Sequence, residues 1–117
     1  MSEFLLLFRG EGKAHAYGQR SPEEGQKLMM KWTKWVESLA KEGKFVSGEP
    51  LSRDGAVVRG TKKLVTDGPF TEGKEVIGGF ILVNANNIKE AVELSRGCPI
   101  LEFEGNVEVR EVHKMQM

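Results

Sequence analysis

The fold of this chain is decided by a charged turn and the apolar strand that follows it. The turn is Val65-Thr66-Asp67-Gly68-Pro69-Phe70-Thr71-Glu72-Gly73-Lys74-Glu75, and the strand is Val76-Ile77-Gly78-Gly79-Phe80-Ile81-Leu82-Val83. Asp67-Gly68-Pro69 predicts a tight turn, because an aspartate carboxylate accepts bonds from nearby backbone, glycine tolerates positive φ, and proline fixes φ. The strand is so apolar that both of its faces are expected to be buried. Chemistry is therefore expected where the charged turn meets this strand.

The composition points to one globular domain, residues 1–117. Seventeen basic and seventeen acidic side chains give a net charge of zero, which argues against a dedicated nucleic-acid-binding role. The longest apolar runs, 4–8 and 80–83, are far shorter than the roughly 20 residues that cross a bilayer. Glu3 precedes the first run, where a signal peptide carries positive charge. We expect a soluble cytoplasmic protein with no membrane partner.

The sequence predicts neither a metal site nor a cofactor. Cys98 is the single cysteine, which excludes an intrachain disulfide and is consistent with a reducing compartment. A free cysteine at a helix end is most often a small buried hydrophobic residue. Together with His15 and His113 it is the whole set of soft ligands, and none of them has zinc-site spacing. No Ser-His-Asp arrangement, phosphate loop or dinucleotide fingerprint is recognisable.

A long helix is predicted after a polar segment. Ser21 is the expected N-cap, Pro22 takes the first helical position, and Glu24 completes a capping box. Apolar residues then recur at three- and four-residue spacing, and most of the lysines are expected on the solvent-exposed side of the helix. The apolar stripe consists of Leu28, Trp32, Trp35, Val36 and Leu39. Gly43 is the expected helix stop.

The remaining elements complete a recognisable order. Asn86 or Asn87 caps a second helix at 88–96, which Gly97 ends. Strands are predicted at 3–9, 45–51, 79–84 and 107–112, and a hairpin at 56–59 with 64–66. This is the ferredoxin-like α+β order βαββαβ with an inserted β-hairpin.

Two helices can cover only one face of such a sheet. Strands 3–9 and 79–84 carry apolar residues on both faces, so a monomer would expose a large apolar patch. We therefore expect a homodimer with two-fold symmetry, sheet against sheet, which makes a dimeric α/β barrel around an enclosed space.

Five blocks of sequence carry a family resemblance: residues 65–70, Lys74-Glu75, Gly78-Gly79-Phe80, the Ala91 helix that ends in Cys98-Pro99, and Val107-Glu108-Val109-Arg110. Together they resemble the YCII-related proteins of the DGPF type, over nearly the whole chain. The resemblance implies a dimeric ferredoxin-like α+β barrel, in agreement with the order of elements. It implies little about a reaction. Relatives share their fold with muconolactone isomerases and small monooxygenases, and some lie beside or fused to sigma factors, but fold alone does not set function.

The turn supplies four candidate site residues. Asp67 is either a turn former or a general base, and Phe70 either plugs the core or stacks on a ligand. Lys74 and Glu75 are adjacent, so on an extended strand one of them faces inward. An inward Glu75 would be desolvated and could carry protons, whereas an inward Lys74 would favour an anionic ligand. A salt bridge with a neighbouring strand is the alternative for either.

Three further candidates lie outside the turn. Arg9, at the end of the first strand, could hold a carboxylate in a bidentate pair or reach out to solvent. His15 is either a solvated loop residue or an acid-base group that titrates near neutrality. Glu49 could pair with Arg9 or line the pocket. Wider YCII-like relatives carry a histidine in the first helix where this chain has Trp32, which argues against a histidine-carboxylate dyad here.

The leading hypothesis is a homodimer that binds a small polar or anionic organic molecule in a cleft between sheet and loops. If it is an enzyme, which the sequence leaves open, the expected reaction is a cofactor-independent proton transfer of the isomerase type. The candidates for catalysis are Asp67, Glu75 and His15, and those for ligand binding are Arg9, Glu49, Phe70 and Lys74. The alternative is a non-catalytic interaction module, for example a partner of a transcription factor.

Overall fold

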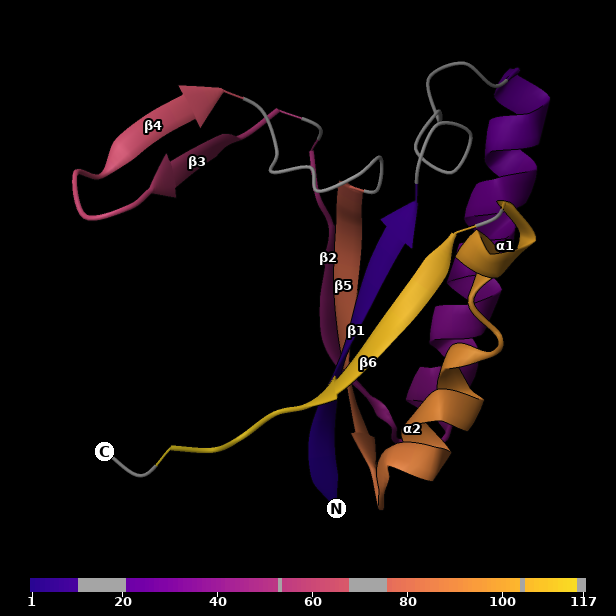
Figure 1. The fold of residues 1–117 in the computed structure, drawn as a ribbon. Coiled ribbons are helices and arrows are strands. Elements are labelled where there is room, and N and C mark those ends of the chain that lie inside the picture. Colours follow the sequence, from indigo (N-terminus) through magenta and orange to yellow (C-terminus); the bar gives the residue numbers. More distant parts are fainter. Residues whose placement is uncertain (11–20, 53, 68–75, 104, 116–117) are drawn as a thin grey trace.

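A computed structural model describes residues 1–10, 21–52, 54–67, 76–103 and 105–115. The elements in chain order are β1 (Ser2–Gly10), α1 (Pro22–Lys41), β2 (Phe45–Pro50), β3 (Ala56–Arg59), β4 (Leu64–Asp67), β5 (Val76–Ala85), α2 (Ile88–Ser95), the 3-10 turn η3 (Pro99–Phe103) and β6 (Asn106–Glu111) (Figure 1).

Four of the strands form one sheet in the order β2-β5-β1-β6, and every neighbouring pair in it is antiparallel. Both helices lie on the same face of this sheet (Figure 1). The β3 and β4 strands form a separate two-stranded sheet. The chain is thus an α+β protein with the predicted ferredoxin-like order and inserted hairpin.

The helix ends follow the predicted local chemistry. Ser21 caps α1 by accepting a hydrogen bond from the backbone N–H of Glu24 at 3.2 Å, and Asn87 caps α2 by accepting one from Glu90 at 2.9 Å. Gly43 adopts φ 72° just after α1, a conformation that favours glycine. Within the described ranges, neither helix combines the length and the apolar character that a membrane span requires.

Most strand and helix ends lie within a residue of the sequence prediction, and two features differ from it more clearly. β5 begins at Val76, three residues before the predicted start at residue 79. Residues after Cys98 form η3, a 3-10 turn that the sequence prediction does not include. A 3-10 turn of this length has no periodic apolar pattern by which a sequence could reveal it.

The core lies between the helices and the sheet. Phe8 of β1 packs edge-on against the two tryptophans of α1, with ring centroids 5.2 Å from Trp32 and 5.9 Å from Trp35. The indole N–H of Trp35 donates to the backbone oxygen of Leu94 at 3.1 Å, which ties α1 to α2. Gly97 makes this approach possible, because a Cβ there would lie 2.8 Å from the Trp35 ring.

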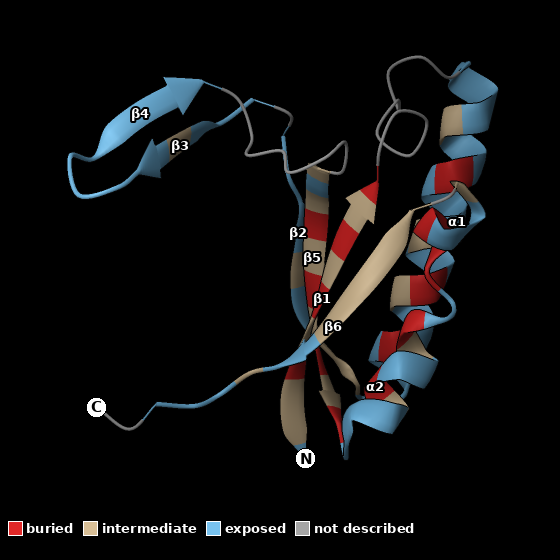
Figure 2. Cartoon of the chain, viewed as in Figure 1, coloured by how far each residue is buried: buried red, intermediate tan, exposed pale blue. Residues whose placement is uncertain are grey.

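The face of the sheet turned away from the helices, called here the open face, carries an apolar strip. Along β1 and β5 the residues alternate between buried and half-buried, as the bands on both strands show (Figure 2). The half-buried set belongs to the open face, where Leu5 lies opposite Leu82 and Leu7 opposite Phe80. These four residues form the apolar strip.

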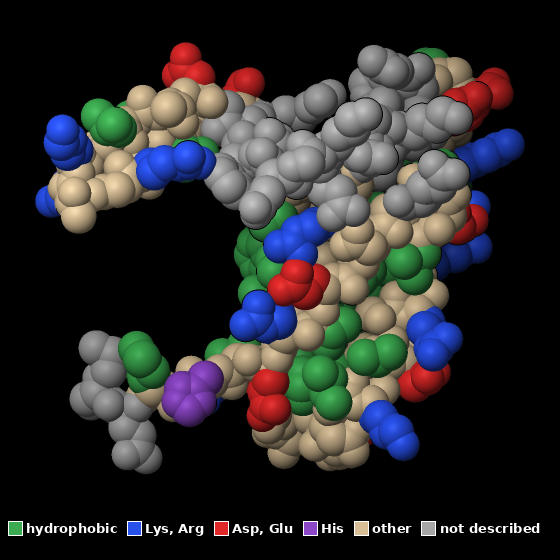
Figure 3. All heavy atoms as spheres, viewed as in Figure 1, with side chains coloured by type: hydrophobic (Ala, Val, Ile, Leu, Met, Phe, Trp, Pro, Cys, Tyr) green, Lys and Arg blue, Asp and Glu red, His purple; other side chains and the backbone are tan. Residues whose placement is uncertain are grey.

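The β3–β4 hairpin projects past the open face as an arm (Figure 1). Its residues Val58, Leu64 and Val65 are 64%, 63% and 65% exposed. The C-terminal segment after β6 projects on the same side, and a hollow separates the two (Figure 3). An isolated two-stranded hairpin is only marginally stable in water. The arm therefore stands to gain stability from contact with a second surface.

Candidate functional site

A cluster of three charged side chains lies at the border of the open face. Arg9 comes from β1, near the end of the strand, and Glu108 and Arg110 come from β6. The Arg9 guanidinium donates through Nη1 to Glu108 Oε1, and the Arg110 guanidinium donates to Glu108 Oε2 at 3.1 Å. One carboxylate therefore holds two arginines, and we call this the Arg9–Glu108–Arg110 cluster.

The antiparallel pairing of β1 and β6 puts this cluster beside the apolar strip. Glu108 lies opposite Leu7, and Arg110 lies opposite Leu5. Residues directly opposite each other in an antiparallel pair share a face of the sheet. The cluster and the strip thus form one continuous surface, apolar in its middle and positively charged at its β6 border.

The two guanidiniums keep Glu108 ionised. The pKa of the Glu108 carboxyl is lowered, chiefly by the hydrogen bond from Arg9 and next by that from Arg110. A carboxylate whose pKa is lowered is a weak base at neutral pH. Glu108 is accordingly suited to orient the arginines and unsuited to carry a proton.

The lowered pKa of Glu108 predicts that the stability of the fold depends on pH. Because the folded-state pKa of Glu108 is below its ordinary value of 4.5, its ionised form stabilises the fold above that pH. We expect Glu108→Gln to be less stable than wild type near neutral pH. The difference should shrink as the pH falls below 4.5 and vanish once Glu108 is protonated in the folded protein. Urea unfolding at a series of pH values measures it.

Glu111→Gln is the matched control, since it removes a carboxylate from an exposed position on the same strand. Its effect should be small and should lack this pH profile. A Glu108→Gln penalty that stays constant down to acid pH would contradict the role of the charge.

The structure places the three predicted site residues that it describes, Arg9, Glu49 and Asp67, on three different strands. Arg9 of β1 pairs with Glu108 rather than with Glu49, because β6 is the neighbour of β1, whereas β5 stands between β1 and β2. Glu49 is exposed on β2, opposite Phe80 at the other border of the apolar strip. Asp67 is exposed at the end of β4, on the hairpin arm rather than on the four-stranded sheet. His15, Phe70, Lys74 and Glu75 lie outside the described residues.

Sequence reasoning missed Glu108 and Arg110 as site residues. Strict alternation in Val107–Val112 predicts a strand with one polar face, which is typical of a solvated edge. The sequence feature that could have pointed to them is the spacing of Glu108 and Arg110, which are two residues apart and so lie on the same face of the strand. Only the pairing of β6 with β1 shows that the face borders an apolar surface.

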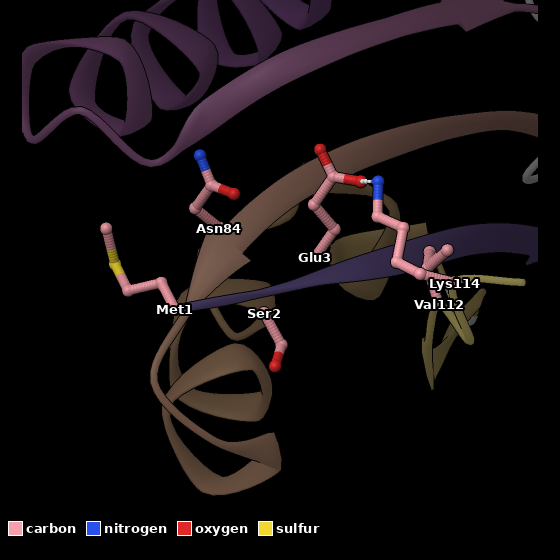
Figure 4. A pocket seen from close by; sticks show the side chains of 6 residues that line it. All are labelled: Met1, Ser2, Glu3, Asn84, Val112 and Lys114. Carbon is pink, nitrogen blue, oxygen red and sulfur yellow. Dashed lines mark ion pairs between the residues drawn. The ribbon is translucent and has the colours of Figure 1, made fainter. Parts of the chain in front are cut away.

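A cavity of about 350 Å³ lies at the opposite end of β1 (Figure 4). Glu3 and Lys114 point toward one another there and form an ion pair of 2.5 Å. The lining residues are Met1, Ser2, Glu3, Asn84, Val112 and Lys114, none of which is a predicted site residue. Elsewhere too, no three His, Cys, Asp or Glu side chains of the described part gather in a way that could hold a metal ion.

The antiparallel sheet, its two helices on one face and the inserted hairpin define a ferredoxin-like α+β protein. The family model of the YCII-related domain matches residues 4–116, and the chain belongs to the YCII-related family. A comparison with curated proteins finds no matching relative.

Proposed function

We propose that this protein is a homodimer whose two open faces meet and enclose a space that binds a small polar or anionic organic molecule. The observation that carries the proposal is the apolar strip on the face turned away from both helices, bordered by the Arg9–Glu108–Arg110 cluster. A second copy would remove the strip from water, and closed two-fold symmetry is the usual form of such a pair.

The hairpin arm and the C-terminal segment support this arrangement. Both project on the side of the open face, so a second copy seated there would lie between them (Figure 3). The exposed Val58, Leu64 and Val65 would then have an apolar surface within reach. The compartment we propose is the cytoplasm, where the buried thiol of Cys98 would stay reduced.

A cofactor-independent proton transfer is the reaction that we propose for this space. Asp67, Glu75 and His15 are the candidates to move the proton, with Arg9 or Lys74 to anchor the ligand. The lowered pKa of Glu108 supports this division of roles, because it leaves proton transfer to another group. The ion pair with Glu108 supports Arg9 as the proposed anchor, because a carboxylate already orients its guanidinium on the strand that carries Leu5 and Leu7.

A non-catalytic interaction module is the second candidate. The exposed apolar residues of the hairpin arm favour it, because a partner such as a transcription factor could cover them. In that case the Asp67-Gly68-Pro69 motif only builds the turn and closes the dimer.

Molar mass and ligand binding together test the proposal. Light scattering in dilute solution should give twice the chain mass. In a thermal-shift screen of organic acids and lactones, at least one compound should raise the melting temperature, since a ligand of the native state stabilises it. Asp67→Asn combined with Glu75→Gln should weaken that shift.

A monomer in dilute solution would overturn the enclosed space. An unchanged ligand shift in the double variant would remove Asp67 and Glu75 from the site. A dimer that no compound stabilises would favour the interaction module.

A further inference from the structure

The Arg9–Glu108–Arg110 cluster differs from an ordinary surface ion pair in its setting. The pair of Arg96 with Glu93 joins the C-cap of α2 to the last turn of that helix, and both of its side chains are 69% exposed. In the cluster, by contrast, Arg9 and Glu108 are 27% and 34% exposed and come from different strands. Such partial burial strengthens the interaction of these charges with each other and with any ion beside them.

The cluster carries one excess positive charge. Two guanidiniums share the single carboxylate of Glu108, each through an Nη1 group. A guanidinium has five N–H donors in a planar fork that matches the two oxygens of a carboxylate. Arg110, at 70% exposure, is the more accessible of the two. The cluster thus favours an anionic group of planar, two-oxygen shape.

The neighbouring surface favours an apolar body on the same ligand. Leu7 and Leu5 lie directly opposite Glu108 and Arg110, and Phe80 and Leu82 follow on the next strand. A molecule held at the cluster by its charged end would therefore extend across aliphatic and aromatic side chains. Apolar area covered in this way adds to the affinity in proportion to its size.

We propose that the Arg9–Glu108–Arg110 cluster binds the carboxylate of a small organic acid whose apolar body lies on the apolar strip. This inference rests on the proposed ligand-binding function and narrows its ligand to one class. Arg9 and Arg110 are the binding residues. Glu108 is a positioning residue, because it orients both guanidiniums through its two oxygens.

Three probe compounds separate the parts of the proposal: phenylacetate, its uncharged amide phenylacetamide, and acetate, which lacks the apolar body. Phenylacetate is titrated into the full-length protein, and backbone amide resonances are followed by NMR. The resonances of residues in β1 and β6 should shift. The amide and acetate should each bind about tenfold more weakly or worse, since one lacks the charged hydrogen bonds and the other the apolar area.

Arginine variants then test the cluster itself. Arg110→Gln and Arg9→Gln should each weaken phenylacetate binding about tenfold and leave the weak binding of the amide unchanged. Arg96→Gln is the matched control for Arg110→Gln, because it removes an ion-paired arginine of similar exposure at the C-cap of α2, and it should have no effect.

The Glu108→Gln variant distinguishes two roles for Glu108: orienting the two arginines, or only offsetting their positive charge. If Glu108 only offset positive charge, its removal would strengthen phenylacetate binding, whereas loss of orientation should weaken it severalfold. Stronger binding in this variant would overturn the positioning role.

Equal binding of phenylacetate and its amide, or phenylacetate binding unaffected by Arg9→Gln and Arg110→Gln, would overturn the carboxylate site and leave the ligand-binding dimer standing. Absence of phenylacetate binding at millimolar concentration would also overturn the site. The dimer is tested separately by its molar mass.

Discussion

Replacing Trp35 with alanine is expected to lower the free energy of unfolding by about 3–5 kcal/mol. Trp35 is 7% exposed and packs against Phe8 and Trp32 at centroid distances of 5.9 Å and 5.8 Å. Its indole N–H also bonds the oxygen of Leu94, so one side chain joins α1, α2 and β1. The truncation leaves a cavity and an unpaired carbonyl. Urea unfolding followed by far-UV circular dichroism, at one fixed protein concentration, measures the loss.

Two variants on the same helix separate the contribution of the hydrogen bond from that of apolar packing and provide an exposed control. Trp35→Phe keeps most of the apolar contact but removes the N–H donor, and it should cost about 1–3 kcal/mol. Met29→Ala truncates a side chain that is 64% exposed, and it should change stability by less than about 0.5 kcal/mol. A Trp35→Ala loss no larger than that of Met29→Ala would contradict the placement of Trp35 in the core.

Replacing Leu7 with lysine is expected to dissociate the proposed dimer. Leu7 lies in the apolar strip, between Phe80 on β5 and Glu108 on β6. Two-fold symmetry would bury two new ammonium groups at the interface, and an uncompensated buried charge costs about 3–5 kcal/mol. The dissociation constant should therefore rise by about a hundredfold or more. Sedimentation velocity over a dilution series measures it.

The single chain should tolerate this lysine, because in a monomer its side chain can reach water. A far-UV circular dichroism spectrum like that of wild type would verify the fold. Leu101→Lys makes the same change at a 44% exposed position on η3 and should leave the dimer intact. A Leu7→Lys protein that folds and remains as dimeric as wild type would exclude the open face as the interface.

The candidate site was only partly predictable. Arg9 could be singled out because it ends an apolar strand, but its partner could not, since Glu108 is 99 positions away in the sequence. Asp67 drew attention through its turn chemistry, and the structure places it on the hairpin arm. In the sequence, Glu108 and Arg110 have the pattern of the solvent-exposed face of an edge strand. Their significance depends on which strand lies beside them.

The sequence by itself determined the order of helices and main strands and where both helices begin, because helix caps depend on contacts within three or four residues. Ser21 reaches the N–H of Glu24, Asn87 reaches that of Glu90, and the continuous apolar run 4–8 already marks two apolar faces on β1. Only the tertiary structure decided which charges meet and which apolar face stays open. Those outcomes depend on strand order and register, which the whole sheet sets when segments distant in sequence pair. That pairing placed Leu7 and Glu108 side by side on one face of the sheet.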